Sequence, residues 1–136
     1  NQYERLLQSE FFAPRNLYVT DFIRGMDKAY KAADLVISRA GASSISELCL
    51  LGKASILVPS PNVAEDHQTH NAMALVNKNA ALIVKDAEAE EKLIPLAIKT
   101  VTDTALLQNL GENALAMAFR DSDIKIAEEI FNLIKN

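Results

Sequence analysis

Residues 35–51 have the sequence LVISRAGASSISELCLL. The apolar run at 35–38 gives way to short, small residues around Gly41, and apolar residues then return with helical spacing. This pattern predicts a strand, a tight turn at Gly41 and a helix that ends near Leu51. The first N–H groups of a helix lack backbone partners and carry a partial positive charge, so a turn without bulky side chains lets a phosphate approach them.

Small residues at the start of this helix favour a nucleotide diphosphate as ligand. Gly41 and Ala42 supply the lack of bulk, and Ser43 and Ser44 add hydroxyl donors. Glu47, one turn further along, can accept hydrogen bonds from both hydroxyls of a ribose. A different interpretation stays open, because Ser44-x-x-Glu47 is also a capping box that would satisfy the helix start without any ligand.

Composition restricts the class of protein. The chain has 136 residues, of which 49% are hydrophobic, which suits one globular domain with a real core. A net charge of −4 leaves no basic surface for nucleic acid. No apolar run reaches the roughly 18 residues of a membrane span and no signal-like segment opens the sequence, so we expect a cytoplasmic protein. Cys49 is the single cysteine and lies among leucines, which predicts a buried, inert thiol.

Strands and helices alternate along the chain. We predict strands at 17–20, 35–38, 55–58 and 81–84, and helices at 3–9, 26–33, 67–77, 87–101, 104–117 and 121–134. Gly52 is expected at the C′ position of the helix before it, and Gly111 as a weak point in its helix. The pattern predicts an α/β fold, a Rossmann-like parallel sheet with flanking helices. Ligands bind at the carboxyl edge of such sheets, where the loops at 21–25, 39–44 and 59–70 would meet.

A second polar cluster, EDHQTHN at 65–71, begins the helix after the third predicted strand. Gln68 and Asn71 share a helix face, and their amides can donate to and accept from sugar hydroxyls. The alternative is an ordinary polar helix start capped by Asp66. His67 and His70 raise the question of a metal site, but no further histidine and no nearby cysteine completes a ligand set, so we predict none.

Asp121-Ser122-Asp123 matches the Asp-x-Asp pattern of metal–nucleotide sites in some glycosyltransferases. Here the motif opens a predicted helix, where acids favour the positive end of the helix dipole. We therefore interpret it as a helix cap.

Three stretches in order resemble a known family: FIRGMDKAYKAAD at 22–34, SRAGASSISE at 38–47 and DHQTHNA at 66–72. The chain is similar, from about Leu17 to its C-terminus, to the MurG family of bacterial UDP-N-acetylglucosamine:lipid I N-acetylglucosaminyltransferases. The resemblance implies a GT-B arrangement of two Rossmann-like domains, with the donor sugar nucleotide in the C-terminal one. Residues 1–136 would be a single partial domain of that donor half, without the acceptor domain and the first strands.

The resemblance also implies roles for individual residues. Those implied to bind substrate are Phe22 and Ile23 at the uracil, Ala42, Ser43 and Ser44 at the diphosphate, Glu47 at the ribose, and Gln68 and Asn71 at the N-acetylglucosamine hydroxyls, with His67 beside them. Arg39 and Gly41 are also expected to bind substrate. Two departures limit the transfer of these roles. Ser44 replaces the threonine of many relatives, and the glycine-rich loop of the first part of the donor domain is absent.

For the parent enzyme, the resemblance implies inverting transfer of N-acetylglucosamine to lipid I, which forms lipid II. The helix start at 42–44 would oppose the charge of the leaving UDP, so neither a metal nor a cofactor is expected. His67 is the one candidate base here, and we expect the base in the missing domain and no activity from the fragment alone. The protein would be peripheral on the inner face of the plasma membrane.

Other functions remain open at this point. The chain could belong to another UDP-sugar GT-B enzyme, such as a glycolipid synthase or an epimerase, or to a non-catalytic nucleotide-sugar-binding subunit. If it holds only strands 3 to 6 of the order 3-2-1-4-5-6, an apolar sheet edge lies open between the strands at 17–20 and 35–38. We therefore expect either an excised part of a longer protein or self-association through that edge.

Overall fold

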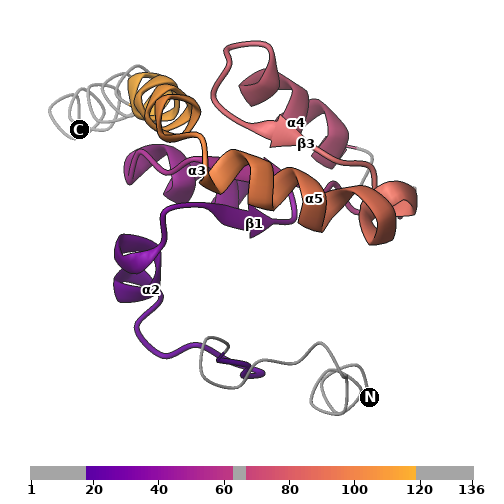
Figure 1. Cartoon of the computed structure of the whole chain (residues 1–136), viewed down its shortest axis with the longest axis horizontal. Coiled ribbons are helices and arrows are strands. Elements are labelled where there is room, and N and C mark those ends of the chain that lie inside the picture. Colours follow the sequence, from indigo (N-terminus) through magenta and orange to yellow (C-terminus); the bar gives the residue numbers. More distant parts are fainter. Residues whose placement is uncertain (1–17, 63–66, 119–136) are drawn as a thin grey trace, which may run out of the picture.

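The structure, a computed structural model, describes residues 18–62 and 67–118 (Figure 1). Its elements are α2 (Met26–Ala32), β1 (Val36–Ser38), α3 (Ala42–Leu50), β2 (Ser55–Leu57), α4 (His67–Val76), β3 (Leu82–Ile83), η2 (Asp86–Glu88), α5 (Ala89–Val101) and a helix over residues 104–118. The helices predicted at 3–9 and 121–134, the Asp121-Ser122-Asp123 motif and the proposed Asp66 cap lie outside the described residues. In the described part, no helix has the length and apolar character needed to cross a bilayer.

The three strands form a parallel sheet in the order β1-β2-β3. Ile37 of β1 pairs with Ile56 of β2, and Ile56 in turn pairs with Leu82 of β3. All three residues of β2 are buried, which is typical of a central parallel strand covered on both faces. The predicted parallel sheet with flanking helices is therefore confirmed.

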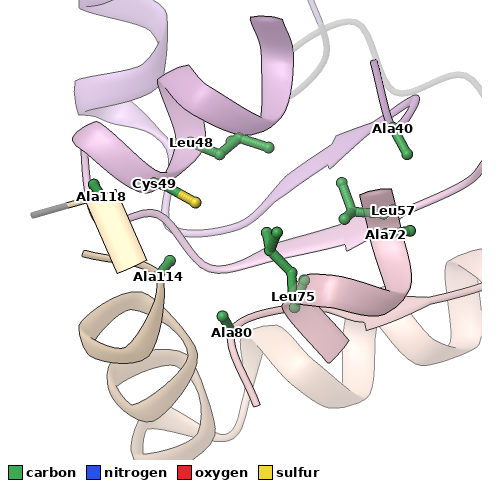
Figure 2. Close-up of a cluster of buried hydrophobic side chains, with 10 residues drawn as sticks. Ala40, Leu48, Cys49, Leu57, Ala72, Leu75, Ala80, Ala114 and Ala118 are labelled. Atoms are coloured by element: carbon green, nitrogen blue, oxygen red, sulfur yellow. The ribbon is translucent and has the colours of Figure 1, made fainter. Parts of the chain in front are cut away.

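Two apolar clusters cover the two faces of the sheet. One face carries Leu57 and packs against α3, α4 and the helix at 104–118 through a set rich in alanine: Ala40, Leu48, Cys49, Ala72, Leu75, Ala80, Ala81, Ala114 and Ala118. Figure 2 shows Leu48, Leu57 and Leu75 converging between these elements. The opposite face carries Ile56 and Val58, over which α5 packs. Cys49 is buried in the first cluster, in agreement with the prediction of a structural thiol.

Gly52 ends α3 as predicted. Its φ is +60°, and the N–H groups of Gly52 and Lys53 donate to the carbonyls of Cys49 and Leu48 at 3.0 Å each. This is a Schellman motif, which needs a residue with positive φ at C′. Gly111, predicted as a weak point, instead lies against this turn, since an added Cβ would come within 2.6 Å of the Gly52 carbonyl oxygen.

The prediction of a strand at 17–20 is wrong for residues 18–20, which the structure describes. Residues 18–20 have no regular structure, and Tyr18 is 86% exposed. A short β-type run forms a strand only when it finds a partner, and within the described residues β1 pairs with β2 alone. The outer edge of β1 therefore lies at the border of the sheet, with the Ile37 side chain 42% exposed.

Candidate functional site

The start of α3 forms the centre of the candidate site. Gly41 is the N-cap in an extended conformation, its carbonyl accepts from the Ile45 N–H at 3.0 Å, and no side chain caps the helix. The N–H groups of residues 42–44 therefore lie at an uncapped helix start, where the helix dipole favours an anion. The capping-box interpretation is wrong for this helix, because Ser44 is its third residue and not the residue before it.

Open space lies in front of this helix start. The φ of Gly41 is −69°, a value that any residue adopts, and an added Cβ would meet no atom within 4 Å. Neither backbone strain nor packing thus requires glycine here. Ala42 and Ser43 are exposed and Ser44 is half-buried, so the first turn can be reached from solvent.

Glu47 of α3 forms a hydrogen bond with a residue of α2. Its Oε2 accepts a hydrogen bond from the Tyr30 hydroxyl of α2 at 3.2 Å. Burial raises the pKa of Tyr30, and the hydrogen bond and negative charge of Glu47 raise it further. The phenol is protonated at neutral pH, so Tyr30 is the donor and the Glu47 carboxylate is the acceptor in this bond.

Gln68 and Asn71 hold the turn from α4. The Gln68 Oε1 accepts from the backbone N–H groups of Ala40 at 3.3 Å and Ser60 at 2.9 Å. The Asn71 Nδ2 donates to the Ala40 carbonyl at 3.3 Å. Both backbone groups of the buried Ala40, directly before Gly41, are thus tied to one helix face. Gln68 uses its amide oxygen in these bonds, and Asn71 uses its amide nitrogen. The sugar contacts of both residues stay a prediction.

Arg39 spans the carboxyl edge of the sheet. Its Nη1 lies 2.7 Å from Asp86 Oδ1, and it also donates to the Val58 and Pro59 carbonyls at 3.3 and 3.4 Å. The guanidinium therefore joins the ends of all three strands, because β1 precedes Arg39, β2 precedes Val58 and β3 precedes Asp86. The Arg39 side chain is 55% exposed. Its contact with substrate stays a prediction.

The structure does not gather every predicted residue around the turn. Phe22, 74% exposed, and Ile23 lie in a segment before α2 that extends away from the sheet and α3 (Figure 1). His67 and His70 are exposed in the first turn of α4. Within residues 18–62 and 67–118, no three histidine, cysteine or acidic side chains come together as a metal site would require.

Comparison with known proteins identifies the family. The family model described as the glycosyltransferase family 28 C-terminal domain matches residues 1–127. The chain belongs to this family. This family 28 domain is 64% identical over 118 residues to the UDP-N-acetylglucosamine–N-acetylmuramyl-(pentapeptide) pyrophosphoryl-undecaprenol N-acetylglucosamine transferase of Bacteroides fragilis, a match that covers 87% of this chain and 31% of the relative.

Two further relatives agree. The protein of the same name from Cytophaga hutchinsonii is 47% identical over 132 residues, which cover 97% of this chain and 35% of the relative. The crystal structure of Acinetobacter baumannii MurG superposes with a TM-score of 0.65 at 36% identity, covering 71% of this chain and 29% of the other. The family 28 domain thus spans about a third of the length of the relatives it matches.

Sequence reasoning assigned no role to Tyr30 or Asp86. Tyr30 lies in the helix predicted at 26–33, and helical periodicity does not report the hydroxyl at the end of an aromatic ring. Asp86 comes two residues after the strand predicted at 81–84, so its place at the carboxyl edge of the sheet could have been predicted. Its pairing with Arg39, 47 residues earlier, could not.

Proposed function

We propose that the chain is the UDP-N-acetylglucosamine-binding part of a glycosyltransferase that transfers N-acetylglucosamine to lipid I and forms lipid II in peptidoglycan synthesis. Membership of the family and the names of the relatives support this function. The single observation that carries it is the uncapped start of α3 with open space before Gly41. Unsatisfied N–H groups that face solvent suit the diphosphate of a sugar nucleotide.

The chemistry follows from this placement. An acceptor hydroxyl attacks the anomeric carbon, the bond from that carbon to the diphosphate oxygen breaks, and UDP leaves with the bonding electrons. Negative charge grows on the diphosphate as the bond breaks, and fixed N–H dipoles at residues 42–44 stabilise it without having to reorganise. Glu47 accepts from the ribose hydroxyls, and Gln68 and Asn71 lie beside the turn on the side of α4.

The remaining parts of the machinery belong to the longer protein in this proposal. The chain supplies the donor-binding half of a GT-B pair. His67 is its one base candidate and has weak support, so the acceptor domain supplies the general base. Its acceptor carries a polyprenyl chain, so the full-length protein works as a peripheral protein at the inner face of the plasma membrane.

Glu47 offers the sharpest test. In the full-length protein, Glu47→Ala removes the acceptor for the ribose hydroxyls, and we expect UDP affinity measured by calorimetry to fall by about 1–3 kcal/mol. The matched control is Glu112→Ala, which removes a carboxylate that bonds Gln108 within the helix at 104–118. That control should bind UDP like the unmodified protein.

Two results would contradict the proposal. One is a Glu47→Ala protein that binds UDP with unchanged affinity. The other is a full-length protein that binds UDP-N-acetylglucosamine but transfers the sugar only to acceptors other than lipid I, which would point to a different UDP-sugar transferase.

A further inference from the structure

The contact between Tyr30 and Glu47 joins two elements that are distant in sequence. Tyr30 lies near the end of α2, and its ring packs at the border of the main core cluster. Its hydroxyl donates to Glu47 Oε2 at 3.2 Å. Burial first, and then Glu47, raises the pKa of Tyr30 above the ordinary 10.0, so the hydroxyl is a donor at neutral pH and stays one into more alkaline solution.

Few contacts fix α2 to the rest of the described structure. The helix buries none of its residues fully, and Figure 1 shows it beside the body formed by the sheet and the other helices. Besides Tyr30, the Lys53 Nζ donates to the Lys31 and Ala33 carbonyls at 3.3 and 2.9 Å and thereby holds the C-terminal end of α2. Tyr30 and Lys53 thus do different things, because Tyr30 contacts the carboxylate and Lys53 contacts only backbone.

An oriented carboxylate suits a diol better than a mobile one. Glu47 is exposed on α3, where its long side chain could take many rotamers. A carboxylate has about four lone-pair sites, so the bond from Tyr30 uses one of them and leaves the others for two neighbouring hydroxyls. Holding the side chain before binding removes an entropy loss that would otherwise accompany binding.

We propose that Tyr30 is a positioning residue that orients the Glu47 carboxylate for the two ribose hydroxyls and so sets the preference of the site for a ribonucleotide over a 2′-deoxyribonucleotide. This role rests on the proposed function of the site and adds a selectivity determinant to it. Tyr30 acts through Glu47 and does not itself contact the nucleotide.

The test compares UDP with 2′-deoxy-UDP on the full-length protein. Tyr30→Phe keeps the ring that packs on the core and removes only the donor. We expect the Kd for UDP to rise about 3- to 10-fold and the Kd for 2′-deoxy-UDP to rise less than about twofold, because the second nucleotide has lost one of the hydroxyls that the oriented carboxylate serves. The ratio of the Kd for 2′-deoxy-UDP to the Kd for UDP should therefore fall.

Lys53→Met is the matched control. It loosens the end of α2 without touching Glu47, so both Kd values should change by the same factor and their ratio should stay constant. Placing Tyr30→Phe in a Glu47→Ala background should add no further loss of UDP affinity. Thermal unfolding of each variant confirms that the compared proteins are folded.

Different failures have different meanings. If Tyr30→Phe changes both Kd values equally, or changes neither, while Glu47→Ala weakens UDP binding, the positioning role is overturned and the proposed nucleotide site stands. A further loss in the double variant also overturns the positioning role. If Glu47→Ala leaves UDP affinity unchanged, the nucleotide site itself fails and the role of Tyr30 fails with it.

Discussion

A Cβ added at Gly41 would meet no atom within 4 Å, whereas one added at Gly111 would lie 2.6 Å from the Gly52 carbonyl oxygen. The two glycines are equally small but serve different needs. At Gly41 the missing side chain leaves space that faces solvent in front of α3. At Gly111 it allows two backbone segments to touch.

Gly41→Ala should separate binding from stability. We expect the free energy of unfolding to stay within about 0.5 kcal/mol of the unmodified value, because the backbone and the surroundings accept a methyl group. UDP affinity should fall about tenfold, since the methyl group enters the space through which the diphosphate approaches. Calorimetry with UDP and urea unfolding of the full-length protein measure the two effects. Unchanged UDP binding would argue against a diphosphate at this helix start.

The Tyr30 hydroxyl gives a pH signature. Its pKa in the folded protein is raised above the ordinary 10.0, so the folded state holds this proton more tightly than the unfolded state. The associated stability is fully present below pH 10.0 and is lost as pH rises through the higher folded value. The difference in unfolding free energy between the unmodified protein and Tyr30→Phe should thus be constant from pH 8 to about 9 and then shift against the unmodified protein. A difference that is flat to pH 11 would contradict the pairing with Glu47.

At the scale of elements, α4 supports the turn that precedes α3. Gln68 accepts from backbone N–H groups of two loops, and one of its donors belongs to the fully buried Ala40. Arg39 joins the same edge of the sheet through Asp86 and two carbonyls. The loops of the candidate site are therefore held by bonds from α4 and by bonds to one another.

Gln68→Ala should lower stability as well as UDP affinity. Removing the amide leaves a buried N–H without its acceptor, a loss of about 1–3 kcal/mol in the free energy of unfolding. Urea unfolding measures this loss. The matched control is Thr69→Ala, a change at the neighbouring residue, whose side chain is exposed. If Gln68 only contacts the sugar, its replacement would weaken substrate binding and leave unfolding unchanged.

The helix at 104–118 packs against the turn between α3 and β2. Gly111→Ala would gain about 1 kcal/mol of helix propensity, but the contact with the Gly52 carbonyl forces an overpacking loss of about 1–3 kcal/mol. We expect a net loss of stability in thermal unfolding. The reverse result would mean that these two segments move apart readily.

At the scale of the whole molecule, β1 is one of the two edge strands of the described sheet, and its outer edge has no strand beside it. Ile37 is partly exposed on this strand, and an unpaired edge with apolar side chains invites pairing with another chain. The 136-residue chain on its own should therefore elute above monomer size in gel filtration as its concentration rises. Ile37→Lys should reduce that shift, and a clean monomer at every concentration would contradict pairing through the edge.

Local patterns in the sequence predicted the order of the described elements and proposed a site at the turn after the strand at 35–38. Apolar runs predicted strands and small residues at Gly41 predicted the start of the next helix, because both signals lie within one element. The structure, and not the sequence, decided that no side chain caps this helix. The resemblance across three motifs supplied the family, which the comparisons confirm.

Only the tertiary structure decided which partner each polar side chain takes. The Tyr30 bond to Glu47, the Arg39 bond to Asp86 and the bonds of Gln68 to Ala40 and Ser60 join residues from different elements. The strand expected at 17–20 needed a neighbour that the described chain does not offer, and its own β propensity could not replace one. The periodicity of apolar residues predicts which face of an element is buried. Hydrogen-bond partners depend on how helices and loops meet in the folded chain.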